Sequence, residues 1–514
     1  MRRVLAAGAL LASALLPAVP VEATPLYQQH CAACHGADRL GGMGPALLPE
    51  NLSRLRKPEA ARMIRDSRPG VQMPAFRGTL DDAQVAALLE YIYKPAIPAP
   101  RWEAADIRAS RVAPERQGAP LERPRYAADP LNLFVVVEAG DHHVTVLDGD
   151  RLEPIHRFAS RFALHGGPKF SPDGRYVYFA SRDGWLTKYD LRALETVAEV
   201  RAGINTRNAA VSSDGRYVIA ANYLPHSLAV FDADLNLVRV IEARDSKGAS
   251  SRVSAVYDAA PRRSFIAALK DVPELWEISY DPAAEPIATG LVHDFRMKEG
   301  AFIPGFLNPR RTPLEDVLDD FFFTPDYRQL VGTRRDGKQA QVVHLHVRRA
   351  IAQFDLPGLP HLGSGITWER GGTRVMATPN LGEGLVTVVD IATWKKVGQV
   401  PTLGPGFFLR SHEGSRYVWV DSMMSPAGRD TLQVIDKQTL DIAARLRPVP
   451  GRTLAHIEFD RYGRYALASL WEDDGALIVF DAATLAEVKR IPMRKPVGKY
   501  NVYNKTRRSE GTSH

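Results

Sequence analysis

The stretch Ser171-Pro172-Asp173-Gly174-Arg175-Tyr176-Val177 decides the fold of most of this chain. A polar, glycine-containing turn runs directly into β-forming residues, which is typical of a tight turn followed by a strand. The unit recurs as Ser213-Asp214-Gly215-Arg216-Tyr217-Val218, and weaker copies begin at Thr324, Gly414 and Tyr462. A recurring turn and strand predicts a repeat architecture.

A second repeated unit gives the number of repeats. It is an apolar strand that ends in aspartate or a substitute and leads into a short turn. Its copies end at Asp148, Asp190, Asp232, Asp281, His346, Asp390, Asp436 and Asp481. Most copies are about 40 to 50 residues apart, the period of a four-stranded propeller blade. We therefore predict an all-β, eight-bladed propeller over residues 128–505, with an insertion from Gly300 to Asp320 and a C-terminal tail over 506–514.

Upstream of the repeats, Cys31-Ala32-Ala33-Cys34-His35 has the spacing of a c-type haem attachment site. The two thiols reach the vinyl groups on one edge of a porphyrin, and the next residue places an imidazole on the iron. We expect one covalent haem c, held by Cys31 and Cys34, with His35 as a ligand of the iron. A structural zinc site or a redox dithiol would need partners that we do not find in the sequence. The chain has no other cysteine, so no disulfide is expected.

The residues around this motif have a helical pattern. Apolar residues recur at helical spacing over 57–66 and 80–92, and a short helix is expected over 25–30. Together with the haem motif, this pattern predicts a small all-α class I cytochrome c domain over residues 24–95. Residues 96–127 are rich in proline and charge and are expected to form a linker.

The second iron ligand of haem c should be a methionine between these helices. The candidates are Met43, Met63 and Met73. We favour Met73, because it lies shortly before the last helix and Pro74 stiffens its loop. Met63 lies on a helix face, where packing is its simpler role.

The N-terminus predicts export. Arg2-Arg3 is followed by an apolar run from Val4 to Leu16 and by small residues at Val21-Glu22-Ala23. We predict a signal peptide over 1–23, cleaved near Ala23, and a periplasmic location. The apolar run is shorter than the roughly 20 residues needed to cross a bilayer, so no membrane span is expected. The net charge of +7 is spread along the 514 residues, so no nucleic-acid partner is expected.

A c-type cytochrome joined to an eight-bladed propeller resembles the cytochrome cd1 nitrite reductases. The resemblance rests on Phe162-Ala163-Leu164-His165, Ser181-Arg182-Asp183-Gly184 and the stretch from Pro496 to Asn504. It implies that His165 is the proximal ligand of a non-covalent haem d1. It also implies that arginines bind the carboxylates of that haem and that tyrosines contact its ring. The arginines at matching places are Arg157, Arg182 and Arg207, and the tyrosines are Tyr500 and Tyr503.

The departures from the reductases point to a different reaction. Asn380 stands where the reductases have a first distal histidine, His412 matches the second, and Glu138 stands near an expected arginine. His456 is a histidine that the reductases lack. This pattern resembles the NirN-type dihydro-haem d1 dehydrogenases, which oxidise a propionate of the haem d1 precursor to acrylate in the last step of haem d1 biosynthesis.

That resemblance implies a catalytic pair, with His456 as distal ligand or base and His412 as its helper. The substrate and product would be dihydro-haem d1 and haem d1, and the electrons would leave through haem c to an external acceptor. Other haem d1 maturation proteins and a nitrite reductase are possible partners. His361, in a loop, is left open as a further pocket residue.

Three other functions stay open at this point. The protein could be a nitrite reductase with one distal histidine, a haem d1 carrier without chemistry, or an electron-transfer scaffold without a second cofactor. Nitrite turnover, the fate of a bound tetrapyrrole and the absorption of a second haem would distinguish them.

Overall fold

The computed structural model describes residues 21–42, 44–53, 55–67, 73–114, 121–289, 300–333 and 338–508, without the side chain of His165. The first 20 residues of the predicted signal peptide and Met43 lie outside these ranges. No helix among the described residues is long and apolar enough to cross a membrane.

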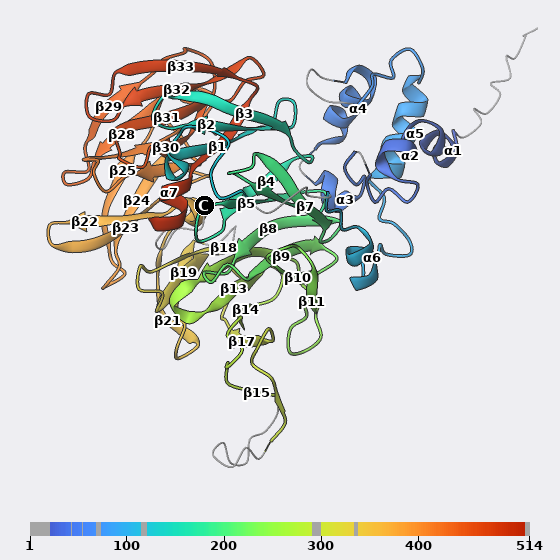
Figure 1. Ribbon diagram of the computed structural model, residues 1–514, viewed down its shortest axis with the longest axis horizontal. Helices are drawn as coiled ribbons and strands as arrows, with labels where there is room; N and C mark the ends of the chain where they lie inside the picture. The colour runs from blue at the N-terminus through green and yellow to red at the C-terminus, as the bar shows by residue number, and fades with distance from the viewer. Residues whose placement is uncertain are drawn as a thin grey trace, which may run out of the picture.

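The N-terminal part is helical and lies to one side of the β-structure (Figure 1). Its helices are α1 (Ala23–His30), α2 (Ala32–His35), α3 (Pro49–Leu52), α4 (Lys57–Asp66) and α5 (Asp82–Ile92). Asp81 caps α5, because its carboxylate accepts the backbone N–H of Gln84 at 2.8 Å. The buried faces of α1, α4 and α5 meet around Tyr27 and Leu88. The predicted all-α cytochrome c fold is confirmed.

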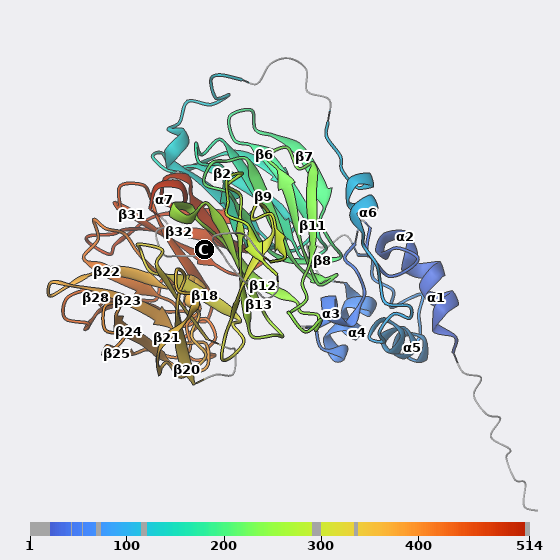
Figure 2. The same cartoon turned by 90° about the horizontal axis from the view of Figure 1, so that it is seen from below.

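The described residues between 133 and 501 form eight four-stranded antiparallel sheets and one short two-stranded sheet (Figures 1 and 2). Seven of the four-stranded sheets are continuous in sequence or nearly so. They are β4 (Leu164–Phe170), β5 (Tyr176–Ser181), β6 (Trp185–Asp190) and β7 (Glu195–Arg201); β8 (Asn205–Val211), β9 (Tyr217–Leu224), β10 (Ser227–Asp232) and β11 (Leu237–Glu242); β12 (Val253–Ala259), β13 (Ser264–Leu269), β14 (Glu274–Ser279) and β17 (Pro309–Pro313); β18 (Asp320–Phe323), β19 (Gln329–Thr333), β20 (Gln339–His344) and β21 (Arg349–Asp355); β22 (Ile366–Arg370), β23 (Thr373–Pro379), β24 (Leu385–Asp390) and β25 (Lys396–Pro401); β26 (Leu409–Ser411), β27 (Tyr417–Val420), β28 (Leu432–Asp436) and β29 (Ile442–Leu446); β30 (Leu454–Phe459), β31 (Tyr465–Leu470), β32 (Gly475–Asp481) and β33 (Glu487–Met493).

The remaining sheet closes the ring. It contains β1 (Leu133–Glu138), β2 (His143–Asp148) and β3 (Glu153–Ala159), and its innermost strand is β34 (Pro496–Asn501) from the far end of the chain. Helix α7 (Val502–Arg507) follows β34 and crosses residue 506, where the predicted tail begins. The predicted eight-bladed propeller is confirmed.

The repeated units have fixed places in the blades. The strand that ends in aspartate is the third strand of its blade, and the Ser171–Arg175 type of turn joins the first strand to the second. Within the second blade, Arg175 reaches across to the buried Asp190 at 2.8 Å. The seventh blade has the same ion pair between Arg416 and Asp436, so in these two blades the repeat supplies both a turn and its ion pair.

The insertion lies earlier than predicted. It separates β14 from β17 in the fourth blade and contains a short hairpin of β15 (Ile287–Ala288) and β16 (Phe302–Ile303). The prediction of an insertion from Gly300 to Asp320 was wrong at its end, because residues 309–313 form the outer strand of that blade.

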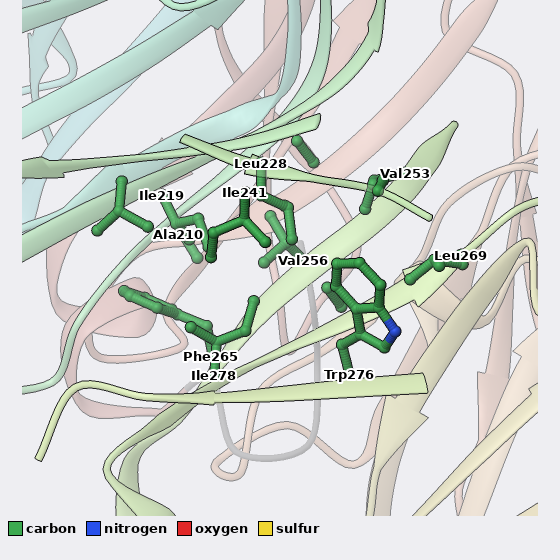
Figure 3. Packing of buried hydrophobic residues seen from close by; sticks show 14 of the residues in the cluster. Ala210, Ile219, Leu228, Ile241, Val253, Val256, Phe265, Leu269, Trp276 and Ile278 are labelled. Carbon is green, nitrogen blue, oxygen red and sulfur yellow. The ribbon is translucent and has the colours of Figure 1, made fainter. Parts of the chain in front are cut away.

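Apolar residues fill the space between neighbouring blades. Figure 3 shows Ile219 and Leu228 of the third blade packed toward Val256 and Trp276 of the fourth. These four side chains are fully buried. Each such burial contributes roughly 2 kcal/mol, so the ring is held by its blade interfaces.

Asp258 lies in this region and gives a testable pH dependence. It accepts a hydrogen bond from the Tyr280 hydroxyl at 2.7 Å, and burial raises its pKa to about 7. Because the pKa is higher in the folded than in the unfolded chain, this group favours folding below about pH 4, and that stability is lost as the pH rises through 7. We expect Asp258→Asn to flatten this part of the profile of melting temperature against pH between 4 and 8. An unchanged profile would contradict the assignment.

The linker follows the surface of the propeller. It contains α6 (Ala104–Ala109), which packs on β7 and β11 through the buried Ile107. Val112 pairs with Glu199 of β7 through two backbone hydrogen bonds of 2.8 Å. The linker is thus attached to the second and third blades.

The two ends of the central channel differ. First strands of neighbouring blades contact one another, as β4 does β8 and β30 does β34, so they surround the axis. We call the end with the loops between second and third strands the front face, and the end with the turns between first and second strands the rear face. Residues at the start of a first strand lie toward the front face.

Candidate haem-binding and catalytic sites

The surroundings of His35 suit a metal ligand. It is 8% exposed, and its Nδ1 lies 2.8 Å from the carbonyl oxygen of Pro45. Nδ1–H therefore donates to that carbonyl and leaves the Nε2 lone pair for a metal. Burial lowers the pKa of His35, which favours the neutral ligand form. A Cβ on Gly44 would lie 2.7 Å from the His35 ring, so only glycine fits beside it.

The other haem c residues surround the same helical core. Cys31 and Cys34 are half-buried and unbonded to each other; Cys31 directly precedes α2, and Cys34 lies within it. Cys31 and Met73 both pack against the core of α1, α4 and α5, and the Met73 carbonyl accepts the Ser67 hydroxyl at 2.6 Å. This arrangement fits a covalent haem c between the two chain segments.

The first strands of several propeller blades carry β-bulges near the front face. The register of β8 shifts at Arg207, and that of β30 shifts at His456. In β4 the shift follows His165, whose backbone lies opposite Ala180. A bulge redirects the side chain of the extra residue, and bulges often lie beside active sites. Arg207, His456 and the backbone of His165 therefore all lie at or beside a bulge in a first strand.

His456 is buried at the inner end of its bulge. It is 1% exposed, and its φ of 50° lies in the left-handed region. Its ring lies 4.6 Å from that of Phe408 and 5.1 Å from that of Tyr500. Burial raises the pKa of Tyr500 to about 12, so its hydroxyl stays protonated and can donate a hydrogen bond. The structure therefore brings His456 and Tyr500 together.

Two buried charged residues support His456, and neither was among the predicted site residues. Nζ of Lys499 donates to the His456 carbonyl and to the Ser469 hydroxyl, the latter at 2.9 Å, and lies 3.4 Å from Nδ1 of His456. Asp421 accepts the backbone N–H groups of Phe407 and His456 at 2.7 and 3.3 Å. Burial lowers the pKa of Lys499 and raises that of Asp421 to about 6. These contacts hold the bulge in place.

The three predicted arginines are not equivalent. Arg207 is the bulged residue of β8, and its guanidinium lies 4.7 Å from the Tyr223 ring. Arg182 lies in a front-face loop, where its backbone N–H donates a hydrogen bond to the Ala163 carbonyl, two residues before His165. Arg157 instead lies on the outermost strand β3 and pairs with Glu138 and Asp141 at 2.9 and 2.6 Å.

His412 and Tyr503 lie at the rear face, away from His456. His412 follows the first strand β26 instead of preceding it, and its Nε2 accepts from Arg508 at 2.7 Å. Tyr503 lies on α7, with the Arg461 guanidinium 4.6 Å from its ring. The structure does not join them to His456, because opposite ends of a first strand face opposite ends of the channel.

The buried amide of Asn380 indicates that a polar ligand fits at the front face. It is fully buried, and neither Nδ2 nor Oδ1 has a hydrogen-bond partner among the described residues. The adjacent Pro360 leads to His361, whose ring lies 4.0 Å from that of Phe407. A buried amide without partners costs stability unless a bound group satisfies it. The residues present therefore fit a ligand with polar side chains.

Comparison with known proteins agrees with this geometry. The family model for the cytochrome D1 heme domain matches residues 128–298 and 305–505, and that for the cytochrome C oxidase cbb3-type subunit III matches residues 20–92. The dihydro-haem d1 dehydrogenase of Pseudomonas aeruginosa is 55% identical over 100% of both chains. The chain belongs to the dihydro-haem d1 dehydrogenase family. A solved structure of the dehydrogenase NirN in complex with DHE superposes with a TM-score of 0.87 at 55% identity, covering 94% of this chain and 99% of that one.

More distant relatives belong to related proteins. Protein NirF of Pseudomonas aeruginosa is 30% identical over 71% of this chain and 90% of its own. The nitrite reductase of Stutzerimonas stutzeri is 25% identical over 97% of this chain and 96% of its own. The family resemblance read from the motifs is thus confirmed for the dehydrogenase.

Proposed function

We propose that the chain is a periplasmic dihydro-haem d1 dehydrogenase that oxidises a propionate side chain of the haem d1 precursor to acrylate. The observation that supports this most is His456, a buried imidazole in a bulge of the innermost strand β30 beside Tyr500. The full-length similarity to the Pseudomonas aeruginosa dehydrogenase supports the same substrate.

The reaction breaks two C–H bonds and forms one C=C bond, and it releases two protons and two electrons. His456 is the proposed distal ligand or base, since an imidazole accepts a proton near neutral pH. The Tyr500 hydroxyl, kept protonated by burial, is proposed to donate a hydrogen bond to the substrate. Bound haem c takes electrons one at a time.

The tetrapyrrole is proposed to bind at the front face. Arg182 and Arg207 are the proposed partners of its carboxylates, since guanidinium groups pair with carboxylates through two hydrogen bonds. Arg157 is the weaker proposal, because Glu138 and Asp141 already pair with it. His165 is proposed as the proximal iron ligand.

His35 and Met73 are the residues proposed to hold the iron of haem c. Export through the signal peptide over 1–23 would place the protein in the periplasm, where an external acceptor collects the electrons. The similarity to NirF and to a nitrite reductase supports an involvement with the haem d1 pathway. We propose other haem d1 maturation proteins and nitrite reductase as partners.

The deciding experiment adds dihydro-haem d1 and an electron acceptor to the purified holo-protein and measures the mass of the extracted tetrapyrrole. We expect the loss of two hydrogen atoms and the reduction of haem c. Bound but unchanged precursor would instead indicate a carrier, and nitrite turnover would indicate a reductase.

Asn380 gives a second test of the site. We expect Asn380→Leu, which removes the buried amide at similar volume, to weaken tetrapyrrole binding by about tenfold without lowering the melting temperature. Equilibrium titration followed by absorption measures the affinity, and thermal unfolding of the apo-propeller with haem c attached measures stability. Wild-type affinity would show that the amide does not contact the ligand.

A further inference from the structure

One arginine joins the cytochrome domain, the linker and the propeller. Arg201, the last residue of β7, is 6% exposed. Its Nε donates to the Asp183 carbonyl at 2.9 Å, and its Nη2 donates to the Leu40 carbonyl of the cytochrome domain. The guanidinium lies 4.8 Å from the Trp102 ring of the linker, whose Nε1–H donates to the Arg201 carbonyl at 2.9 Å.

The cytochrome segment that Arg201 contacts also positions the haem c ligand. Gly41, next to Leu40, donates its N–H to the His35 carbonyl at 2.8 Å. Pro45 accepts from the His35 ring, and Ala46 is fully buried in a cluster with Ile204 of the propeller. Leu40, Gly41, Pro45 and Ala46 therefore connect His35 to the propeller surface.

The propeller segments at this contact lead to the proposed tetrapyrrole site. Asp183 follows Arg182, and Ile204 lies three residues before Arg207. The Asn51 amide donates to the Ile204 carbonyl at 3.3 Å, and the Asn205 amide donates to the Glu50 carbonyl at 3.4 Å. The propeller residues that contact the haem c domain are thus next to, or within three residues of, both arginines in sequence. Figures 1 and 2 both place α3 beside β8.

We propose that Arg201 is a positioning residue that fixes the haem c domain on the propeller and so sets the path of electrons between the two redox groups. This inference rests on the proposed function. Arg201 suits the role because a buried guanidinium donates strong, directional hydrogen bonds to two carbonyls of separate domains. The Asn51 and Asn205 amides are neutral and their bonds are longer, so they hold the domains less firmly.

Arg201→Ala in the full-length holo-protein tests the proposal. We expect the single-turnover reduction of haem c after mixing with dihydro-haem d1 to slow by about tenfold, since the loss of charge-assisted hydrogen bonds reduces the docked population. Tetrapyrrole affinity, measured by titration, should stay within about twofold of wild type. Small-angle scattering should show a larger radius of gyration without any substrate.

Two further variants keep the test independent of folding. Arg216→Ala is the matched control, because it removes an exposed arginine from a rear-face turn and should change none of these readouts. Asn51→Leu removes a propeller contact from the cytochrome side and should slow haem c reduction less than Arg201→Ala.

The outcomes separate this inference from the proposed function. Slow reduction with retained binding and an expanded shape supports the positioning role. Reduction at the wild-type rate in Arg201→Ala, or an unchanged radius of gyration, overturns it. Failure of the wild-type protein to reduce haem c with this substrate would instead remove the proposed function, whatever the scattering shows.

Discussion

His456→Ala is expected to lower the rate of dihydro-haem d1 oxidation by about 10²- to 10⁴-fold while the tetrapyrrole still binds. The imidazole is the buried histidine beside Tyr500, and its removal takes away the proposed base at that position. Single-turnover mixing, with the extracted tetrapyrrole identified by mass, measures the rate. Titration by absorption measures binding.

The backbone at His456 decides the choice of a second variant. Its positive φ disfavours alanine but suits asparagine, which tolerates the left-handed region. His456→Asn should therefore fold as well as wild type and still lose activity. His346→Ala is the control, because that histidine is exposed and lies outside the channel. Activity retained in His456→Asn would show that another group takes the proton.

Asp421→Ala is expected to destabilise the protein by about 3 to 5 kcal/mol. The carboxylate is fully buried and accepts the N–H groups of Phe407, Phe408 and His456, at 2.7, 3.2 and 3.3 Å, which would lose their acceptor together. Because Asp421 holds both the His456 backbone and Phe408, which packs against the His456 ring, activity should fall along with the melting temperature. Denaturant unfolding of the holo-protein measures the loss.

A graded pair of variants distinguishes this effect from a general loss of charge. Asp421→Asn keeps one carbonyl oxygen and should be destabilised by less than Asp421→Ala. Asp473 is exposed, so Asp473→Ala should change the free energy of unfolding by less than about 0.5 kcal/mol. Equal losses in Asp421→Asn and Asp473→Ala would refute the proposed role of the buried acceptor.

The parts of the fold that were predicted well depend on local signals. The Ser171–Val177 unit contains its own turn, and the strand that ends in aspartate or a substitute recurs once per blade, so its eight copies could be counted without any knowledge of packing. Helix α4 has the predicted bounds, because its apolar spacing and the proline near its start are local as well. The insertion was misplaced since strand β17, Pro-Arg-Arg-Thr-Pro, has almost no apolar residues.

The parts of the site that were missed depend on register and on distant partners. His412 directly follows the first strand β26, whereas His456 lies near the start of the first strand β30. That difference places them at opposite faces, and sequence motifs do not encode it. Lys499 and Asp421 were missed because a buried charge is acceptable only through partners far along the chain, as Lys499 is with His456.

Because strand β34 closes the ring, the site around His456 depends on the last strand of the propeller. The first blade remains without its innermost strand until residues 496–501 arrive, and that strand also carries Lys499 and Tyr500. A chain shortened before residue 496 therefore lacks both the closure of the ring and two of the partners of His456, Lys499 and Tyr500. The site for the tetrapyrrole therefore forms only after the last strand has been synthesised, and an incomplete chain cannot bind the tetrapyrrole there.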